Sequence, residues 1–417
     1  MADLSMKFCG VNFKNPVVAA SATPTRDEEC MIECIKAGCG AIVPKTPSPA
    51  YLEQVYPSPC YYVMYPEEAR RGGWYSLYSS AFLAEWPPEE YLEIVKKVRP
   101  VAEEHDCRII GSVMGGNLDD WKKFTEMYAP VSDVLELNMA CPFGGELEGT
   151  KGNLISGNPE LALKVVEAVR EYTDLPLVAK LSAEGGDLEA LSKHLAKSGK
   201  LAGVHLTHRF GGLEIDIETG KPILSGTASN GYGGPWMAPI SRKWCARVAM
   251  STNLDINGGG GIDNWRDSVA FIMAGASIVQ ICASAMLRGF KVYRETVEGI
   301  NSFLDAHNYK SLSEIKGMSL PLIKSADEVP RTDTAKADAK VYDPDQCIGC
   351  GICEEVCFHH AITVNQIAEM DPAKCSGCGL CSQMCPEKAI RLYLHGEEVP
   401  VFWEGARGHM YEAGRKY

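Results

Sequence analysis

The sequence has no hydrophobic run long enough to cross a membrane, because none of its apolar stretches approaches the roughly 18 residues that a spanning helix needs. The first residues, MADLSMKFCGVNF, lack an apolar core of signal-peptide length. No segment is rich in lysine and arginine, and the net charge is -13, which argues against binding to nucleic acid. We therefore expect a cytoplasmic protein with neither a membrane nor a nucleic acid as its partner.

Cysteine, by contrast, is abundant. Nine of the 17 cysteines are scattered through the first 300 residues, which suits a reducing compartment. The other eight form two copies of one spacing, Cys347-x2-Cys350-x2-Cys353-x3-Cys357 and Cys375-x2-Cys378-x2-Cys381-x3-Cys385. This spacing is typical of domains that bind two 4Fe-4S clusters.

In such domains the fourth cysteine of each run ligates the cluster of the other run. The predicted ligand sets are therefore Cys347, Cys350, Cys353 and Cys385 for one cluster, and Cys375, Cys378, Cys381 and Cys357 for the other. A structural zinc site would not need the third cysteine at this spacing, and a disulfide framework would need an oxidising compartment. Paired clusters pass single electrons, so the rest of the chain must supply or consume electrons.

Residues 1–310 alternate short β-branched runs with helical patterns. Eight such runs are present: Val17–Ala20, Ala41–Lys45, Arg108–Met114, Val134–Ala140, Leu177–Leu181, Val204–Thr207, Leu254–Asn257 and Ile278–Cys282. Apolar runs of this length, each followed by a helix, are typical of a parallel sheet buried on both faces. Eight repeats predict an α/β fold, a (β/α)8 TIM barrel, with a doubly wound open sheet as the alternative.

The rest of the chain predicts a second, smaller domain. Residues 311–340 are charged and without apolar periodicity, which is typical of a linker. Residues 341–395 form the ferredoxin-like domain, in which each cysteine run leads to a short strand, Ala361–Val364 or Ala389–Leu392. Residues 396–417 are a C-terminal tail. Within the barrel, the long aromatic connection at 47–100 predicts either a lid or substrate wall, or a surface for subunit contact.

In a barrel, chemistry is carried at the C-terminal ends of the strands. Those ends carry Ser21, Lys45, Thr46, Asn138, Cys141, Lys180, Thr207, His208, Arg209, the glycines 258–261, Cys282 and Ala283. The backbone N–H groups of the glycines can approach a phosphate closely, and the two lysines can face an anionic cofactor or substrate. Cys141, in a tight turn before a proline, is placed for proton transfer. Taken singly, each feature also fits a plain loop, a solvated lysine or a buried structural thiol.

The segments NPVVAASATPT, VPKT, LELNMACP, LVAKLS, GYGG, INGGGGI and GASIVQICAS occur together in this chain. With them the chain resembles the flavin-containing barrel of the dihydroorotate dehydrogenases and, more closely, the pyrimidine-reducing half of the dihydropyrimidine dehydrogenases. In the latter, the barrel and a ferredoxin domain with two 4Fe-4S clusters follow one another in this same order. The resemblance covers nearly the whole chain and implies FMN, two 4Fe-4S clusters and an oxidoreductase acting on CH-CH bonds.

The resemblance also implies roles for single residues. FMN would contact Ser21, Lys45, Thr46, Asn138, Lys180, Thr207 and Gly234, and its phosphate would lie against Gly259, Gly260, Gly261, Cys282 and Ala283. Cys141 matches the proton-transfer cysteine of the family. The implied reaction adds or removes two hydrogens across a C–C bond next to a carbonyl, with hydride exchanged at the flavin and a proton at Cys141. The clusters would exchange electrons with the flavin one at a time.

The positions that face the substrate depart from the family. Pyrimidine reducers surround the ring with asparagine amides, whereas Ser79 and His208 stand at two of those positions, Arg209 replaces a threonine, and Asn138 is kept. An arginine favours an anionic or carbonyl-rich substrate, because it binds carboxylates through two hydrogen bonds. We therefore expect a dihydropyrimidine dehydrogenase-like enzyme for a non-pyrimidine anionic or aromatic substrate.

Two alternatives remain open at this point. One is a genuine dihydropyrimidine dehydrogenase subunit that reduces uracil or thymine, and the other is a flavin and iron-sulfur electron-transfer subunit without substrate chemistry. No second nucleotide-binding domain is visible in the sequence. The resemblance therefore implies a separate electron donor, either an FAD- and NAD(P)H-binding subunit or a ferredoxin, and a homo-oligomer is a further expectation.

Overall fold

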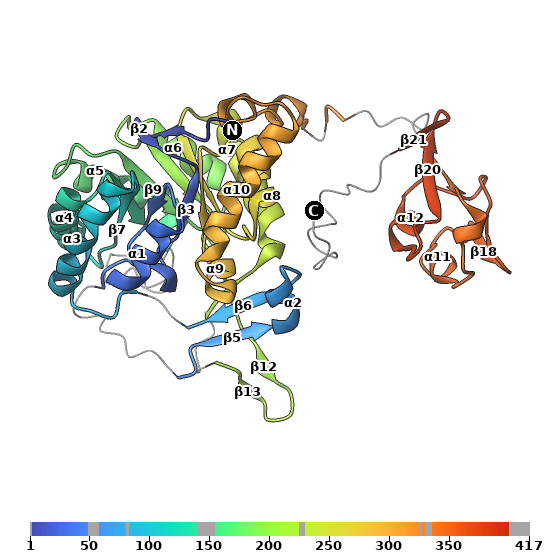
Figure 1. The fold of residues 1–417 in the computed structure, drawn as a ribbon, viewed down its shortest axis with the longest axis horizontal. Helices are drawn as coiled ribbons and strands as arrows, with labels where there is room; N and C mark the ends of the chain where they lie inside the picture. Colours follow the sequence, from blue (N-terminus) through green and yellow to red (C-terminus); the bar gives the residue numbers. More distant parts are fainter. Residues whose placement is uncertain are drawn as a thin grey trace. The chain divides into compact units, whose positions relative to one another are not determined.

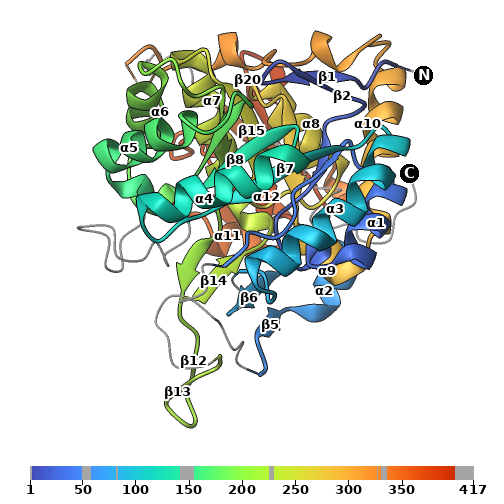
Figure 2. The same cartoon turned by 90° about the vertical axis from the view of Figure 1, so that its left-hand side faces the viewer.

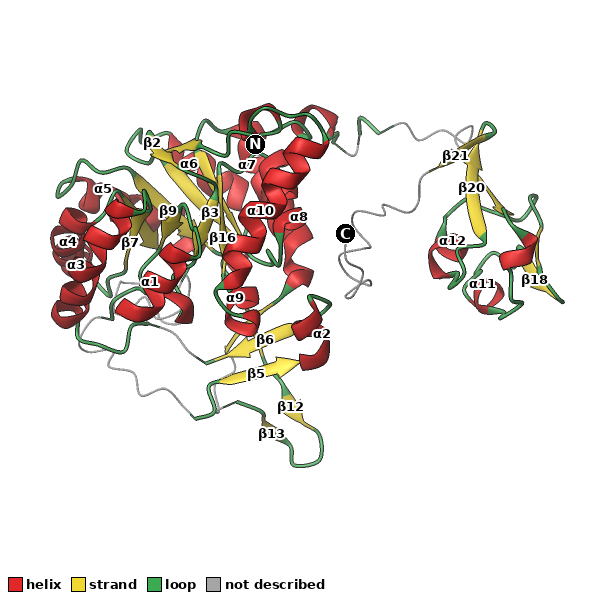
Figure 3. Ribbon diagram, viewed as in Figure 1, coloured by secondary structure: helices red, strands yellow, loops and turns green. Residues whose placement is uncertain are grey.

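The computed structural model describes residues 2–48, 58–80, 83–140, 155–224, 230–325, 327–329 and 336–399. These residues fall into two compact units, the first ending at Ile323 and the second beginning at Lys324. Figure 1 shows both units, Figure 2 shows them turned by 90°, and Figure 3 distinguishes helices from strands.

The first unit is built around a closed barrel of eight parallel strands, in the order β10-β15-β16-β3-β4-β7-β8-β9. The strands are β3 (Val17–Ala19), β4 (Ala41–Ile42), β7 (Arg108–Val113), β8 (Val134–Asn138), β9 (Leu177–Leu181), β10 (Gly203–Leu206), β15 (Asp255–Gly259) and β16 (Ile278–Ile281). Each corresponds to one of the eight predicted runs. The (β/α)8 barrel is therefore confirmed, and the open sheet is excluded.

Helices cover the outside of the barrel (Figure 2). They are α1 (Glu28–Lys36), α3 (Pro88–Glu104), α4 (Leu118–Tyr128), α5 (Pro159–Arg170), α6 (Leu188–Ala196), α7 (Ala238–Ser251), α8 (Trp265–Met273), α9 (Ala283–Arg288) and α10 (Lys291–Ala306). Side-chain caps begin several of them, as when Asn158 accepts a hydrogen bond from the Leu161 N–H at 3.1 Å. Within the described ranges, no helix combines the length and the apolar composition that a membrane crossing requires.

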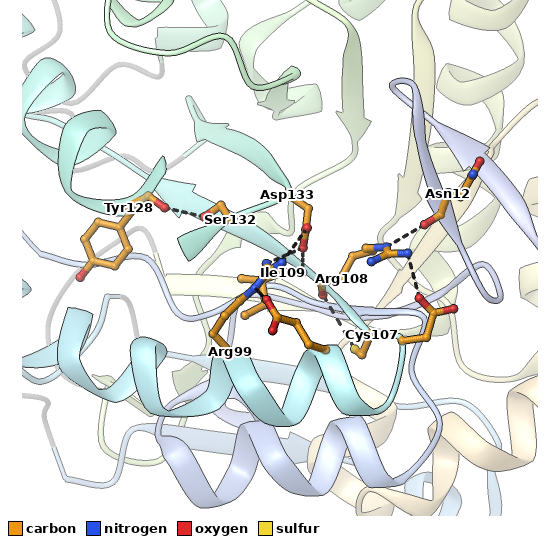
Figure 4. Close-up of polar contacts among 10 residues, drawn as sticks. Asn12, Arg99, Cys107, Arg108, Ile109, Tyr128, Ser132 and Asp133 are labelled. Carbon is orange, nitrogen blue, oxygen red and sulfur yellow. Dashed lines mark hydrogen bonds and ion pairs between the residues drawn. The ribbon is translucent and has the colours of Figure 1, made fainter. Parts of the chain in front are cut away.

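The N-terminal end of the barrel is closed by a hairpin and by ion pairs. Strands β1 (Met6–Phe8) and β2 (Val11–Phe13) form the hairpin, and Phe8 and Phe13 pack against the buried residues at that end of the barrel. In Figure 4, Arg99 of α3 donates to both oxygens of Asp133, the residue before β8, at 2.8 and 3.1 Å. Asp133 also accepts from the Ile109 N–H at 2.8 Å. These hydrogen bonds of Asp133 hold α3, β7 and β8 together at the N-terminal end of the barrel. The predicted site lies at the opposite, C-terminal end.

An antiparallel sheet that the sequence did not predict is formed by two of the long connections. Its order is β11-β14-β6-β5, with β5 (Tyr61–Met64), β6 (Ser76–Ser79), β11 (Phe210–Gly212) and β14 (Asn230–Gly233). Strands β5 and β6 belong to the aromatic connection between β4 and β7, together with the short helix α2 (Pro66–Arg71). Strands β11 and β14 belong to the connection between β10 and β15, which also carries the hairpin of β12 (Ile215–Asp216) and β13 (Lys221–Pro222).

The structure shortens the predicted linker at both ends. Leu312 and Ile315 are fully buried in the core of the first unit, so the segment up to Ile323 packs on the barrel. At the other end, β17 (Asp338–Val341) pairs with β20 (Ile390–Leu394) of the second unit. The prediction of a linker over 311–340 was wrong there. Leu312–Glu314 and Leu320–Leu322 form 3-10 helices and Asp338–Val341 is a four-residue edge strand, and elements this short show no hydrophobic period in the sequence.

In the residues that the structure describes, the second unit contains two small sheets, two short α-helices and a 3-10 helix at Pro344–Gln346. Strands β17, β20 and β21 (Glu397–Val399) form one sheet, and β18 (Ile362–Val364) and β19 (Ala368–Met370) form the other. The helices are α11 (Ile352–Glu355) and α12 (Leu380–Met384). Strands β18 and β20 lie where the two short strands after the cysteine runs were predicted.

Candidate functional site

A cavity lies at the C-terminal ends of the barrel strands, and the antiparallel sheet forms part of its wall. Its lining includes Ser21, Lys45, Thr46, Ser79, Asn138, Lys180, Thr207, His208, Arg209, Gly234, Gly259, Gly260, Gly261, Cys282 and Ala283. The structure thus brings together all the flavin-binding and substrate-binding residues predicted from the sequence. Tyr61, Tyr75 and Leu77 of the aromatic connection also line the cavity, as a substrate wall would. The predicted proton donor, Cys141, lies outside the described residues.

A network of hydroxyl groups centred on Thr46 organises one side of the cavity. Thr46 Oγ1 lies 2.7 Å from Ser112 Oγ and 3.3 Å from Ser21 Oγ, and it accepts a hydrogen bond from Asn138 Nδ2 at 3.2 Å. The Thr46 N–H donates to Ser21 Oγ at 3.0 Å. The other end of the Asn138 amide, Oδ1, is buried without a hydrogen-bond partner among the described residues. A donor on a bound ligand would satisfy this oxygen.

Two buried lysines bring positive charge to the cavity. Lys45 is 4% exposed, and burial lowers its pKa to about 8, although Glu85 acts in the opposite direction. The Lys45 backbone is fixed by a hydrogen bond of 2.8 Å between its N–H and the Tyr91 hydroxyl. Lys180 is 6% exposed, and its Nζ lies 3.4 Å from Glu136 Oε1. A bound anion would be attracted to both ammonium groups.

Sequence reasoning missed three polar residues: His205 and Gln280 in the floor of the cavity, and Glu136 directly beneath it. Glu136 of β8 is fully buried, accepts a hydrogen bond from Gln280 Nε2 at 2.7 Å, and lies 2.8 Å from His205 Nδ1. Burial alone would raise the pKa of Glu136, but Lys180 and His205 hold that pKa down at about 2. The carboxylate is therefore ionised. A signal was present, because an acid, an imidazole and an amide interrupt the otherwise apolar strands VLELN, GVHL and IVQI.

The glycine that ends β15 and the two glycines after it are required by close contacts. A Cβ atom at Gly259 would collide with the His205 ring, and one at Gly261 would collide with the backbone of Ala238. Gly260 and Gly261 also have φ angles of 87° and 88°, which other residues rarely adopt. Only backbone can therefore occupy this edge of the cavity, where N–H groups can approach a phosphate.

Ser79, His208 and Arg209 lie on the side formed by the antiparallel sheet. Arg209 Nη1 donates to Ser79 Oγ at 3.1 Å, and its guanidinium occupies the space that a side chain at Gly231 would need. His208 Nδ1 lies 3.2 Å from the Arg209 carbonyl oxygen, which can only accept, so the proton is on Nδ1 and Nε2 is an acceptor. Burial lowers the pKa of His208 well below its usual value, and Lys180 and Arg209 act in the same direction. His208 is therefore neutral at pH 7.

A buried ion pair ties this wall to the glycine loop. Arg288 Nη1 lies 3.0 Å from Asp263 Oδ1, and the Tyr75 hydroxyl donates to the same oxygen at 2.9 Å. Arg288 also donates to the carbonyl oxygen of Ala69, in α2, at 3.4 Å. Helix α9, the residues after β15 and the aromatic connection are therefore held in one arrangement around the cavity.

These residues fit FMN. The glycine loop suits the phosphate, and the two lysines offset its negative charge. Two acceptors in the lining, Asn138 Oδ1 and Gln280 Oε1, have no hydrogen-bond partner among the described residues. An isoalloxazine ring carries both donors and acceptors, so it can satisfy such groups.

The eight cysteines of the second unit surround two smaller cavities. Cys347, Cys350, Cys353 and Cys385 line one, and Cys357, Cys375, Cys378 and Cys381 line the other. The fourth cysteine of each run thus lies with the first three cysteines of the other run, which is the grouping expected from the spacing. No group of His, Cys, Asp or Glu side chains in the described part of the chain could hold a single metal ion. In a 4Fe-4S cluster each cysteine ligates its own iron, so the sulfur atoms need not converge.

Backbone N–H groups stabilise the cluster thiolates. Ala361 and Ala389 each lie four residues after the last cysteine of a run, and their N–H groups donate to Cys357 Sγ and Cys385 Sγ, both at 3.3 Å. Hydrogen bonds to cluster sulfurs are one of the ways in which a protein adjusts the reduction potential. The two halves of the unit therefore share this hydrogen bond to the last cysteine of the run as well as the spacing of the cysteines.

Comparison with known proteins agrees with this geometry. The family model for dihydroorotate dehydrogenase matches residues 3–304, and that for the 4Fe-4S dicluster domain matches residues 346–389. The chain is 32% identical over 321 residues to the catalytic subunit of dihydroorotate dehydrogenase B (NAD(+)) from Pyrococcus abyssi, covering 76% of this chain and 99% of the relative. It is 27% identical over 363 residues to the NAD-dependent dihydropyrimidine dehydrogenase subunit PreA from Escherichia coli K12, covering 85% of each. The resemblance seen in the sequence is confirmed: the chain belongs to the dihydroorotate dehydrogenase family and is an oxidoreductase of CH-CH bonds that uses FMN and two 4Fe-4S clusters.

Proposed function

We propose that this enzyme acts on an unsaturated carbonyl compound that carries an anionic group and is not a pyrimidine. The observation that supports this is the Arg209–Ser79 pair in the cavity wall. FMN, when bound, supplies the hydride chemistry, and the clusters exchange electrons with it. The protein residues bind and orient the substrate and move the proton.

The donors and acceptors around the substrate support this choice. An asparagine amide offers both a donor and an acceptor, which suits the alternating C=O and N–H groups of a pyrimidine. Arg209 offers donors only, and a planar guanidinium pairs best with a carboxylate. Ser79 accepts from one N–H of Arg209 and orients the guanidinium. Neutral His208 keeps an acceptor at Nε2, and Asn138 retains one amide at the site.

The cofactor assignments of single residues are part of the proposal. FMN would be held by Ser21, Lys45, Thr46, Asn138, Lys180, Thr207 and Gly234, and its phosphate by Gly259, Gly260, Gly261, Cys282 and Ala283. The eight cysteines that line the two cavities of the second unit would ligate the clusters. We assign proton transfer to Cys141 because it follows Asn138, at the end of β8, by three residues.

The electron donor is proposed from the relatives. The two relatives described above are named as subunits, one of a dihydroorotate dehydrogenase B (NAD(+)) and one of an NAD-dependent dihydropyrimidine dehydrogenase. We infer that this chain likewise receives electrons through a separate FAD- and NAD(P)H-binding subunit, or from a ferredoxin, in the cytoplasm. A homo-oligomer is also proposed, as a general expectation for barrels of this kind.

Reoxidation of the reduced protein tests the substrate class. The protein is purified without oxygen, reduced with dithionite, and mixed with uracil, thymine, orotate, or carboxylated and aromatic enones while flavin and cluster absorbance are followed. Rapid reoxidation by a carboxylated enone, lost when its carboxylate is replaced by an amide, is the expected result. Rapid reoxidation by uracil, thymine or orotate would refute the non-pyrimidine assignment. Reoxidation by none of the compounds would favour an electron-transfer subunit.

A further inference from the structure

Directly beneath the floor of the cavity lies a charged residue that the proposed substrate chemistry does not use. Glu136 has no exposed surface and does not itself line the cavity. Its three partners, Lys180, His205 and Gln280, all line it. They come from β9, β10 and β16, and three strands separate β16 from β8 on either side of the barrel. The Glu136 carboxylate therefore reaches across the barrel interior and joins its two sides.

Stability alone does not explain a carboxylate at this position. Taking a charged pair out of water costs several kcal/mol per ion, and apolar residues of similar volume often serve a core equally well. Glu136 nevertheless remains ionised, because Lys180 lies 3.4 Å away and Gln280 and His205 lie within hydrogen-bond distance. The arrangement therefore places one negative charge directly behind the lysine that faces the cavity.

The same carboxylate also sets the tautomer of His205. Burial lowers the pKa of His205, so the ring is neutral at pH 7. An ionised carboxylate only accepts, so the ring proton lies on Nδ1. Nε2 then points towards the position that a side chain at Gly259 would occupy. Glu136 thus holds two groups, the Lys180 ammonium beside the cavity and the His205 ring beneath the glycine loop.

We propose that Glu136 is a positioning residue that sets the net charge at the cavity floor and thereby lowers the reduction potential of bound FMN. The inference rests on FMN occupying this cavity. Reduced FMN carries more negative charge than oxidised FMN, so an uncompensated Lys180 would favour the reduced form. The Glu136 carboxylate offsets that effect and keeps the reduced cofactor a stronger electron donor.

The test is the midpoint potential of FMN in the holoprotein carrying Glu136→Gln, measured by anaerobic spectroelectrochemical titration. This substitution keeps the shape and an acceptor for His205 and Gln280 but removes the charge. The midpoint potential of FMN should rise in the variant. At a fixed applied potential, the ratio of reduced to oxidised FMN should then be larger by on the order of tenfold. The measurement needs no substrate, so its outcome is independent of the substrate class proposed above.

Asp133→Asn is the matched control. Asp133 directly precedes the same strand and is also ion-paired, but with Arg99 at the N-terminal end of the barrel (Figure 4). It lies about 16 Å along the strand from Asn138 at roughly 3.3 Å per residue. An unchanged potential in Glu136→Gln, or an equal shift in Asp133→Asn, would overturn the proposal.

A folding failure of the single variant would also be informative. Glu136→Gln leaves Lys180 buried without its counter-ion, whereas replacing both members of a buried pair is often tolerated. If Glu136→Gln does not fold, the double variant Glu136→Gln/Lys180→Gln should recover the folded protein, measured by circular dichroism and by the cooperativity of thermal unfolding. Failure of the double variant to recover would refute the pairing on which the inference depends.

Discussion

The role proposed for Arg209 makes a quantitative prediction for Arg209→Gln. The guanidinium lies in the cavity wall and is oriented by a 3.1 Å hydrogen bond to Ser79. A hydrogen bond to a charged group contributes about 1.5–3 kcal/mol. At 1.4 kcal/mol per factor of ten, its loss should raise the concentration of anionic substrate that gives half-maximal reoxidation by about 10- to 150-fold. Glutamine keeps polarity and can still donate one bond, so the lower part of that range is the better expectation.

The assay follows reoxidation of the dithionite-reduced protein by stopped flow at increasing substrate concentration. Each variant is measured with a carboxylated enone and with the matching amide. The loss of affinity caused by Arg209→Gln should be much smaller with the amide substrate. The amide lacks the carboxylate with which Arg209 would pair, so the substitution has no ion pair to remove. Arg247→Gln is the control, since Arg247 pairs with Glu189 on the exposed surface of α7. An equal loss with both substrates would refute carboxylate recognition by Arg209, and no loss with either would remove Arg209 from the substrate site.

Three further predictions concern the proton donor, a buried lysine and the cluster ligands. Cys141→Ala should abolish turnover but leave reduction of FMN through the clusters intact, as followed by flavin absorbance, and normal turnover would contradict the assigned role. Burial lowers the pKa of Lys45 to about 8, below its ordinary value, so Lys45 is charged below about pH 8 and loses its charge as the pH rises. The affinity of the apoprotein for FMN, measured by fluorescence titration, should therefore fall above pH 8, and a Lys45→Met variant that kept the same pH profile would rule out Lys45 as its cause. Cys385→Ala and Cys347→Ala should remove the same cluster in electron paramagnetic resonance spectra, whereas Cys357→Ala should remove the other, and loss of different clusters in Cys385→Ala and Cys347→Ala would contradict the exchanged fourth ligand.

Much of the fold could be predicted because its signals are local. The eight buried strands contain short runs of β-branched and apolar residues, and the cluster cysteines follow a fixed spacing within each run. Residues at the C-terminal ends of barrel strands must lie at one end of the barrel, so Lys45, Asn138 and Lys180 could be placed together before any contact was known. The linker was predicted less well, because Leu312 and Ile315 belong to a segment of short 3-10 turns, which has no helical period in its apolar residues.

What the sequence alone determined was the barrel, the ferredoxin-like domain and the residues that lie at the end of each barrel strand. Only the tertiary structure revealed the antiparallel sheet and the floor of the cavity. Arg209 meets Ser79 across 130 residues, and Glu136 meets Gln280 across 144. These contacts depend on which strands become neighbours and on how the barrel closes. The register that brings two distant side chains together is a property of the whole folded unit, so no local pattern can encode it.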